Sequence, residues 1–241
     1  MLTACVTGAD HGLGLALVRK LLLEGYRVIA GRYADHSPGL EQLEAAYADR
    51  LLVTTLDIGS DESVKQAVQA AKEFTPFVDI LINNAGVLGD IDTGLGESLD
   101  FNDMQQVYNI NALGPLRVVN GLLGLLQEGD APLVINISSE AGSISQAARD
   151  RWFAYGMSKA ALNMQSKLVY NALHGDVDVW VIHPGWMKTM MRGKVDDAAD
   201  LTPEQSAEAI FCFIDNRTHE TLEQKGGEIR YFDIEGQDLP W

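Results

Sequence analysis

Residues 2–25 read LTACVTGADHGLGLALVRKLLLEG, and this stretch decides the fold. Residues 2–8 form a short apolar run that ends in glycine, which is typical of a buried strand. Residues 13–25 repeat apolar side chains at helical spacing and stop at a second glycine. The stretch therefore predicts a strand, a tight glycine-rich turn and a helix.

The turn itself carries Gly8, Gly12 and Gly14. Glycines between a strand and a helix permit a tight turn and let backbone N–H groups approach a pyrophosphate. The partial positive charge at the start of the helix adds to that site. The spacing G-x-x-x-G-x-G differs from the dinucleotide fingerprint G-x-G-x-x-G, and an ordinary glycine-rich turn is the alternative.

The rest of the chain repeats this alternation of strand and helix. Apolar, strand-like runs are expected at 26–31, 51–58, 78–86, 132–139, 177–185 and 227–233. Helical periodicity is expected at 39–50, 60–74, 101–127, 153–174 and 202–215. Continuously apolar strands indicate a parallel sheet covered on both faces. The sequence thus predicts one α/β domain over residues 1–241, with a doubly wound parallel sheet of about seven strands, the Rossmann fold.

Composition excludes several classes of protein. The 241 residues are 46% apolar and carry a formal net charge of −16, which disfavours binding to nucleic acid or to an anionic membrane. Cys5 and Cys212 are too few for a disulfide framework and lack zinc-site spacing, so no metal site is expected. No signal peptide or membrane span is recognisable, and a cytoplasmic location is expected.

Polar residues gather where strands are expected to end. Ser138 and Ser139 close the run at 132–139, and Tyr155 precedes Lys159 by one helical turn, on the same face. Asn111 lies in the middle of the helix at 101–127, although asparagine is a poor helix former. If the Tyr155–Lys159 pair stood alone, it could equally well be two side chains that simply face the rim of the core.

Together, these motifs closely resemble those of the short-chain dehydrogenases/reductases along the whole chain. The motifs are T-G-x-x-x-G-x-G at 7–14, N-N-A-G at 83–86, Asn111, Ser139, Y-x-x-x-K at 155–159 and P-G at 184–185. The segments GMSKAALNM, HPGWMKT and FDIEGQDLPW further resemble the C-factor-like carbonyl reductases. The resemblance implies hydride transfer between a nicotinamide cofactor and a carbonyl or alcohol.

The resemblance also implies catalytic roles. Tyr155 would be the general acid or base, and Lys159 with the oxidised nicotinamide would lower the pKa of its phenol. Ser139, rather than its neighbour Ser138, would orient the substrate oxygen. Asn111 would hold a water molecule that links Lys159 to solvent. Trp152 and Phe153 are equally well explained as pocket walls or as core.

Cofactor contacts are expected along the same edge of the sheet. Asp57 would contact the adenine amino group or simply cap a turn, and Thr189 would bond the nicotinamide carboxamide. Asn83 and Ala85 would line the adenine-ribose side. The complete set of expected cofactor residues is Gly8, Asp10, His11, Gly12, Leu13, Gly14, Arg32, Asp57, Ile58, Asn84, Ala85, Gly86, Tyr155, Lys159, Pro184, Gly185, Met187 and Thr189.

NADP(H) is the expected cofactor, with NAD possible. Gly31 replaces the acidic residue that binds the ribose 2′-hydroxyl in NAD enzymes, and it would leave room for a 2′-phosphate. Arg32 could then form charge-assisted hydrogen bonds, aided by a partly charged His11. Residues 186–203 are expected to form a substrate lid.

Two alternatives to an oxidoreductase stay open at this stage. A non-catalytic, cofactor-binding signalling or redox-sensing protein would share the fold, and a sugar-nucleotide epimerase would share the Tyr–Lys pair. Only about 55 residues follow the P-G motif, which is short for the second domain of such an epimerase. A homodimer or homotetramer is expected from the resemblance, and the substrate is a small carbonyl or alcohol.

Overall fold

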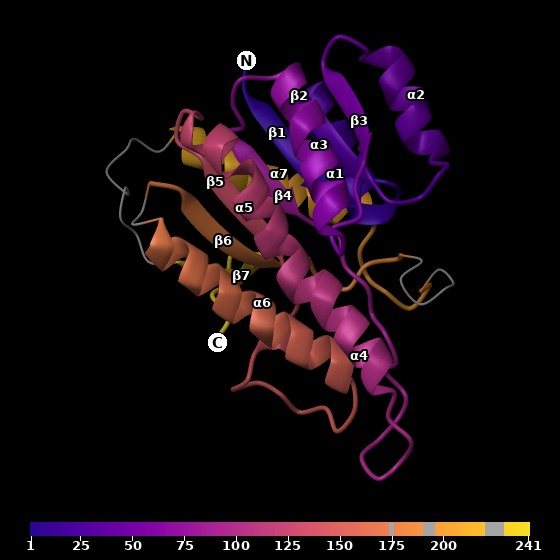
Figure 1. Cartoon of the computed structure of the whole chain (residues 1–241). Helices are drawn as coiled ribbons and strands as arrows, with labels where there is room; N and C mark the ends of the chain where they lie inside the picture. The colour runs from indigo at the N-terminus through magenta and orange to yellow at the C-terminus, as the bar shows by residue number, and fades with distance from the viewer. Residues whose placement is uncertain (174–175, 190–195, 220–228) are drawn as a thin grey trace.

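The computed structural model describes residues 1–173, 176–189, 196–219 and 229–241. Seven parallel strands form one sheet in the order β3-β2-β1-β4-β5-β6-β7 (Figure 1). The strands are β1 (Thr3–Thr7), β2 (Arg27–Arg32), β3 (Leu51–Thr55), β4 (Ile80–Asn83), β5 (Leu133–Ile137), β6 (Asp178–His183) and β7 (Arg230–Asp233). The predicted doubly wound α/β fold is therefore confirmed.

Two layers of helices cover the sheet. One face packs against α1 (Gly12–Leu23), α2 (Pro38–Ala46) and α7 (Pro203–His219). The other face packs against α3 (Asp61–Phe74), α5 (Gly114–Gln127) and α6 (Phe153–Ala172). Each layer encloses its own apolar core cluster, because a sheet with apolar residues on both faces must bury both.

The order of strands reverses between β1 and β4. The chain runs outward from β1 through β2 to β3, and then returns to start the second half of the sheet at β4. Such a switch point leaves a crevice at the carboxyl ends of the strands, where ligands bind in sheets of this kind. The residues that follow β1, β4, β5 and β6 all reach this edge.

The long helix expected at 101–127 changes from α-helical to π-helical geometry in its middle. It consists of α4 (Phe101–Tyr108), the π-helical turn η1 (Asn109–Leu113) and α5, which follow one another without a break. Asn111 lies in this π turn and is 1% exposed. A π turn inside an α-helix is rare and commonly marks a functional site. The expectation of one helix was correct, but its irregularity was not foreseen.

Among the described residues, no helix is both long and apolar enough to span a membrane. Nor does the described part of the chain contain a cluster of histidine, cysteine or acidic side chains suited to a metal ion. The segment expected to form a lid is only partly described, since residues 190–195 lie outside the described ranges.

Candidate active site at the carboxyl edge of the sheet

The glycine turn lies against the loop that follows β4. A Cβ added to Gly8 would lie 2.8 Å from Cα of Ala85, and Gly8 has a φ of +63°. The hydroxyl of Thr7 accepts the backbone N–H groups of Asn84 and Ala85, at 3.0 Å each. The Asn84 amide donates in return to the carbonyl of Gly8, at 3.0 Å. These contacts hold the two predicted cofactor-binding loops in a fixed relation.

Several residues predicted to lie at the cofactor site are buried and also serve the fold, and a contact of Leu13 or Ile58 with the cofactor stays a prediction. Leu13 and Ile58 are 5% and 4% exposed, so their side chains are committed to the two core clusters. Asn83 is also buried and donates to Asn136 at 2.8 Å, so its side chain does not line the adenine-ribose side. A Cβ at Gly31 would lie 2.5 Å from Leu56, which means that this glycine makes room for core packing.

Acidic residues of the predicted cofactor site bond to nearby backbone. Asp10 accepts the N–H groups of Tyr33 and Ala34, at 3.0 and 2.8 Å, and so ties the glycine turn to the end of β2. The Asp57 carboxylate accepts the N–H of Gly59 at 2.8 Å. This bond agrees with the alternative role of Asp57, which is to cap a turn. The contact of Asp57 with adenine stays a prediction.

Arg32 ends β2, and its guanidinium donates to the carbonyl of Asp35 at 3.2 Å. His11 directly precedes α1 and is exposed. Its side chain makes no capping hydrogen bond with the first turn of that helix. Neither side chain has an ion pair with an acidic group among the described residues. Both are therefore accessible to an anionic group near the glycine turn.

A cavity of about 190 Å³ opens beside the start of α1. His11 and Gly12 line one side of it, and Lys188 and Thr189, which follow β6, line the other. A Cβ at Gly12 would lie 3.7 Å from the methyl group of Thr189. The structure thus brings the first and last of the predicted cofactor-binding loops together.

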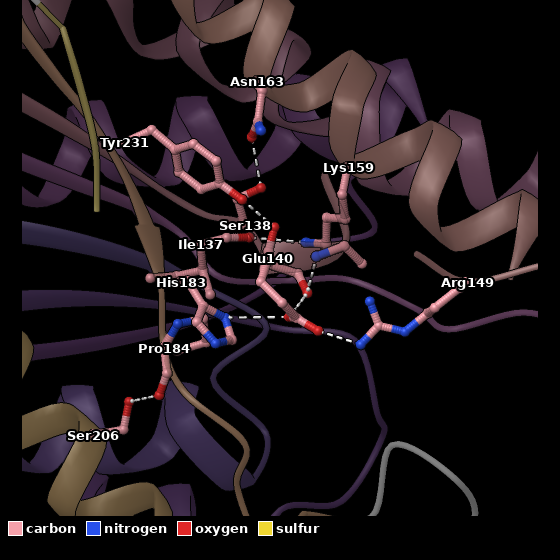
Figure 2. A network of polar contacts seen from close by, with 12 residues as sticks. Ile137, Ser138, Glu140, Arg149, Lys159, Asn163, His183, Pro184, Ser206 and Tyr231 are labelled. Atoms are coloured by element: carbon pink, nitrogen blue, oxygen red, sulfur yellow. Dashed lines mark hydrogen bonds and ion pairs between the residues drawn. The ribbon is translucent and has the colours of Figure 1, made fainter. Parts of the chain in front are cut away.

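The segment after β6 is held at both ends. Gly185 has a φ of +78°, and a Cβ there would lie 2.4 Å from Leu201. The carbonyl of Pro184 accepts the hydroxyl of Ser206 at 2.8 Å (Figure 2). Met187 pairs with Leu201 in a single parallel bridge. A lid role for residues 186–203 stays a prediction.

Lys159 lies in a fully buried position beside Tyr155. Its ammonium donates to the carbonyl of Ile137, the last residue of β5, at 2.8 Å (Figure 2). The same nitrogen is 5.6 Å from the centre of the Tyr155 ring. Burial lowers the pKa of Lys159 to about 8, because a low-dielectric surrounding disfavours the charged form.

Within the protein alone the pKa of Tyr155 is raised, and the lowering expected from Lys159 together with the oxidised nicotinamide stays a prediction. Burial raises it to about 12, although a hydrogen bond with Ser139 and, more weakly, the charge of Arg149 lower it. The charges of Glu140 and Tyr231 raise it further. Desolvation therefore outweighs these two lowering effects, and the phenol is neutral over the whole physiological range.

The two neighbouring serines point to different partners. Ser138 donates to Asn163 at 2.7 Å, in the interior. Ser139 bonds to Tyr155 and also donates to the carboxylate of Glu140 at 2.7 Å. Only Ser139 is thus placed beside the phenol, although its catalytic role is a prediction still to be tested.

The side chain of Asn111 makes three hydrogen bonds within the protein. Its amide exchanges two hydrogen bonds of 2.8 Å with the backbone of Val87 and donates to Ser158 at 3.0 Å. It is also close to the cofactor loop, since a Cβ at Gly86 would lie 3.2 Å from its oxygen. The side chain holds the loop after β4, and its oxygen keeps a second lone pair, so the water expected at Asn111 stays a prediction.

Four residues near the site were not identified from the sequence. The Tyr231 hydroxyl donates to the backbone carbonyl of Ser139 at 2.5 Å. Arg149 and His183 approach Glu140 from opposite sides (Figure 2). Of these four residues, only Glu140 could have been suspected from the sequence, because it directly follows Ser139. Arg149 lies in the same loop as Glu140, Tyr231 and His183 come from other strands, and the spacing of these three residues carries no signal.

The aromatic residues before α6 extend the site. The Trp152 ring meets the Tyr155 ring edge-on, with centroids 6.0 Å apart. The guanidinium of Arg149 stacks over Trp152, 4.7 Å from its centre. Trp152 has a φ of +69°, which is unusual for a residue other than glycine. Trp152 therefore lies beside the predicted catalytic phenol and also packs against the loop before α6.

Comparisons with known proteins agree with this arrangement. The family model for short chain dehydrogenase matches residues 2–200. The protein named C-signal from Myxococcus xanthus is 39% identical over 165 residues, which cover 68% of this chain and 93% of that protein. A putative short-chain dehydrogenase/reductase from Burkholderia multivorans, solved with bound NADP, is 30% identical with a TM-score of 0.84. That match covers 100% of this chain and 99% of the other.

A second solved structure is the NADPH-bound carbonyl reductase from chicken fatty liver. It is 28% identical with a TM-score of 0.84, and the match covers 99% of this chain and 98% of that chain. The similarity to both solved structures thus extends over nearly the whole length of each chain.

Proposed function

The chain belongs to the short-chain dehydrogenase family, and on that premise we propose that it transfers hydride between NADP(H) and a carbonyl or alcohol substrate. The observation that carries the proposal is the placement of Tyr155, Ser139 and Lys159 together at the carboxyl ends of the strands. A carbonyl oxygen that receives a hydride on its carbon gains negative charge, and it needs a proton and hydrogen-bond donors.

In the reductive direction, Tyr155 gives its phenolic proton to the substrate oxygen. The phenol is neutral at physiological pH, since burial raises its pKa to about 12. The bound nicotinamide supplies the hydride. Lys159 carries the positive charge that stabilises the resulting phenolate, from its position 5.6 Å from the ring centre. Tyr155 accepts the proton back when an alcohol is oxidised.

NADP(H) is proposed over NAD because Arg32 and His11 flank the glycine turn without an acidic partner among the described residues. A charge-assisted hydrogen bond contributes about 1.5–3 kcal/mol, which corresponds to roughly ten- to 150-fold in affinity. The two solved relatives that carry NADP or NADPH support this choice. The Asp10 carboxylate, which lies in the glycine turn and accepts the N–H of Tyr33 after β2, acts against it because it adds negative charge there.

The test is a screen for NADPH oxidation across aldehydes, ketones and quinones, with Tyr155→Phe compared to the wild type. We expect at least a hundredfold loss of kcat in Tyr155→Phe, with NADPH binding retained. Tyr108→Phe is the matched control, because Tyr108 is an exposed tyrosine on α4. A Tyr155→Phe variant that keeps most of the activity would remove Tyr155 as the proton donor.

A second candidate is a non-catalytic, cofactor-binding signalling protein. The 39% identity to the protein named C-signal is the observation that favours it. The two candidates differ in one measurement. A wild-type protein that binds NADPH but oxidises it with no member of the panel supports the second candidate.

We also propose that the chain forms a homodimer or homotetramer in the cytoplasm. Large apolar side chains are exposed on α4, α5 and α6, namely Phe101, Tyr108, Leu116, Met157, Met164 and Leu168. A shared apolar surface on neighbouring helices is suited to a symmetric contact between two copies. Light scattering after size exclusion gives the mass in solution, and a monomer at micromolar concentration contradicts the proposal.

A further inference from the structure

Two residues that take no direct part in the proposed hydride transfer hold the segment that carries Ser139. Asn163 lies on α6, one helical turn after Lys159, and Tyr231 lies on β7. Both side chains are buried, and both reach the segment around Ser138 (Figure 2). The segment is therefore held from two different elements of the fold.

Asn163 joins the residues on either side of Ser139 to α6. Its side-chain oxygen accepts the hydroxyl of Ser138 at 2.7 Å, and its side-chain nitrogen donates to the carbonyl of Gly142 at 3.2 Å. A Cβ added to Gly142 would lie 2.9 Å from the backbone carbonyl carbon of Lys159, so the segment lies directly against the helix. One side-chain amide thus fixes both ends of the segment to the helix that also carries Lys159.

Tyr231 fixes the carbonyl of Ser139 itself. Its hydroxyl donates to that carbonyl at 2.5 Å, and the N–H of Gly142 donates to the same oxygen at 2.9 Å. Burial raises the pKa of Tyr231 to about 12, although a hydrogen bond with Asn163 lowers it. The hydroxyl therefore keeps its hydrogen at physiological pH and remains a donor to the serine backbone.

These contacts determine where the Ser139 hydroxyl can lie. The side chain moves with its own backbone, and that backbone is anchored at its carbonyl and at both ends of the segment. The anchors on α6 also fix the segment relative to the Tyr155 phenol, because the same helix carries Tyr155. A displacement of about 1 Å at a reacting centre can lower a rate by about a hundredfold. The placement of the serine beside the phenol thus depends on Asn163 and Tyr231.

We propose that Asn163 and Tyr231 are positioning residues that hold the Ser139 hydroxyl beside Tyr155, so that both groups reach the same substrate oxygen. This inference rests on the proposed oxidoreductase function. It differs from a general role in stability, because it requires both residues to act on the reaction through Ser139. Loss of the Tyr231 hydroxyl removes one of the two hydrogen bonds to the serine carbonyl, and we expect a loss of roughly tenfold in kcat/KM.

The experiment measures the reduction of 4-nitrobenzaldehyde by NADPH in the wild type and in Tyr231→Phe, which lacks only the hydroxyl. We expect kcat/KM for the aldehyde to fall roughly tenfold, while the dissociation constant for NADPH, measured by fluorescence titration, stays the same. Tyr26→Phe is the matched control, because Tyr26 is another buried tyrosine and directly precedes β2, at the opposite edge of the sheet. It is expected to leave both constants unchanged.

A double-mutant cycle separates positioning from general damage. Ser139→Ala is expected to lower kcat/KM further than Tyr231→Phe does, and adding Tyr231→Phe in that background is expected to change little more. Asn163→Ala is expected to behave like Tyr231→Phe in both backgrounds. If Asn163→Ala does not fold, Ser138→Ala tests the same link, because it removes the hydroxyl that Asn163 accepts.

The outcomes separate this inference from the proposed function. No turnover of the aldehyde by the wild type contradicts the proposed function for this substrate class and the inference with it. Turnover that depends on Tyr155 and is unchanged in Tyr231→Phe contradicts the inference alone. An equal loss from Tyr231→Phe with and without Ser139→Ala also overturns it, because Tyr231 would then act by another route. A Tyr231→Phe variant that binds NADPH less tightly by the same factor overturns it as well.

Discussion

Replacing Lys159 by methionine should raise the free energy of unfolding of the protein, although the variant loses its activity. Lys159 is fully buried, and the only hydrogen bond found for its ammonium among the described residues goes to the carbonyl of Ile137. Its pKa falls from 10.5 to about 8, and each pKa unit corresponds to about 1.4 kcal/mol. Keeping the ammonium charged in the folded state therefore costs about 3 kcal/mol at pH 7.

Methionine fills a similar volume without a charge. It leaves the Ile137 carbonyl without its donor, which offsets about 1 kcal/mol. We expect Lys159→Met to raise the free energy of unfolding by about 2 kcal/mol at pH 7. The sign with pH follows from the lowered pKa. Below about pH 8 both states hold the proton, and between pH 8 and 10.5 the folded wild type has released it, so the wild type gains stability as pH rises.

The assay is urea unfolding of the cofactor-free protein at pH 7 and near pH 10. Lys65→Met is the control, because Lys65 is an exposed lysine on α3 and its replacement should have little effect at either pH. The gain from Lys159→Met should shrink at the higher pH. A variant that is no more stable than the wild type at pH 7, or a gain that is equal at both pH values, would refute the burial argument.

Three further outcomes are expected. Arg32→Ala should lower the preference for NADPH over NADH roughly ten- to 150-fold, and an unchanged ratio of kcat/KM values for the two cofactors would rule out Arg32 as the phosphate ligand. The kcat/KM for reduction should fall above about pH 8, as Lys159 loses its proton while Tyr155 stays neutral, and a profile that is flat to pH 10 would contradict this assignment. Asp79→Ala should destabilise the protein by about 2–4 kcal/mol, because Asp79 accepts the buried N–H of Thr3 at 2.7 Å and that of Asp130 at 3.0 Å. Chemical unfolding checks this last value, and Asp79→Asn, which keeps one acceptor, should lose less.

Local patterns in the sequence determined the fold. Apolar runs of strand length, helical spacing and glycine at the turns each follow from a few neighbouring residues, and their alternation leaves few arrangements other than a parallel sheet covered on both faces. The carboxyl ends of such strands meet at one edge. The sequence therefore also determined that Ser139, Tyr155, Lys159 and the glycine turn belong to one region.

Only the tertiary structure decided what each of those side chains does. The pKa of Tyr155 depends on how completely the phenol is buried, and that burial raises it to about 12 within the protein alone. Asn111 and Asn83 proved to be bonded within the protein, since their partners come from distant segments. The cluster of Glu140, Arg149 and His183 could not be read from spacing, because the loop after β5 and the end of β6 meet there only when the chain is folded. Charge and solvation depend on such neighbours, and sequence order does not record them.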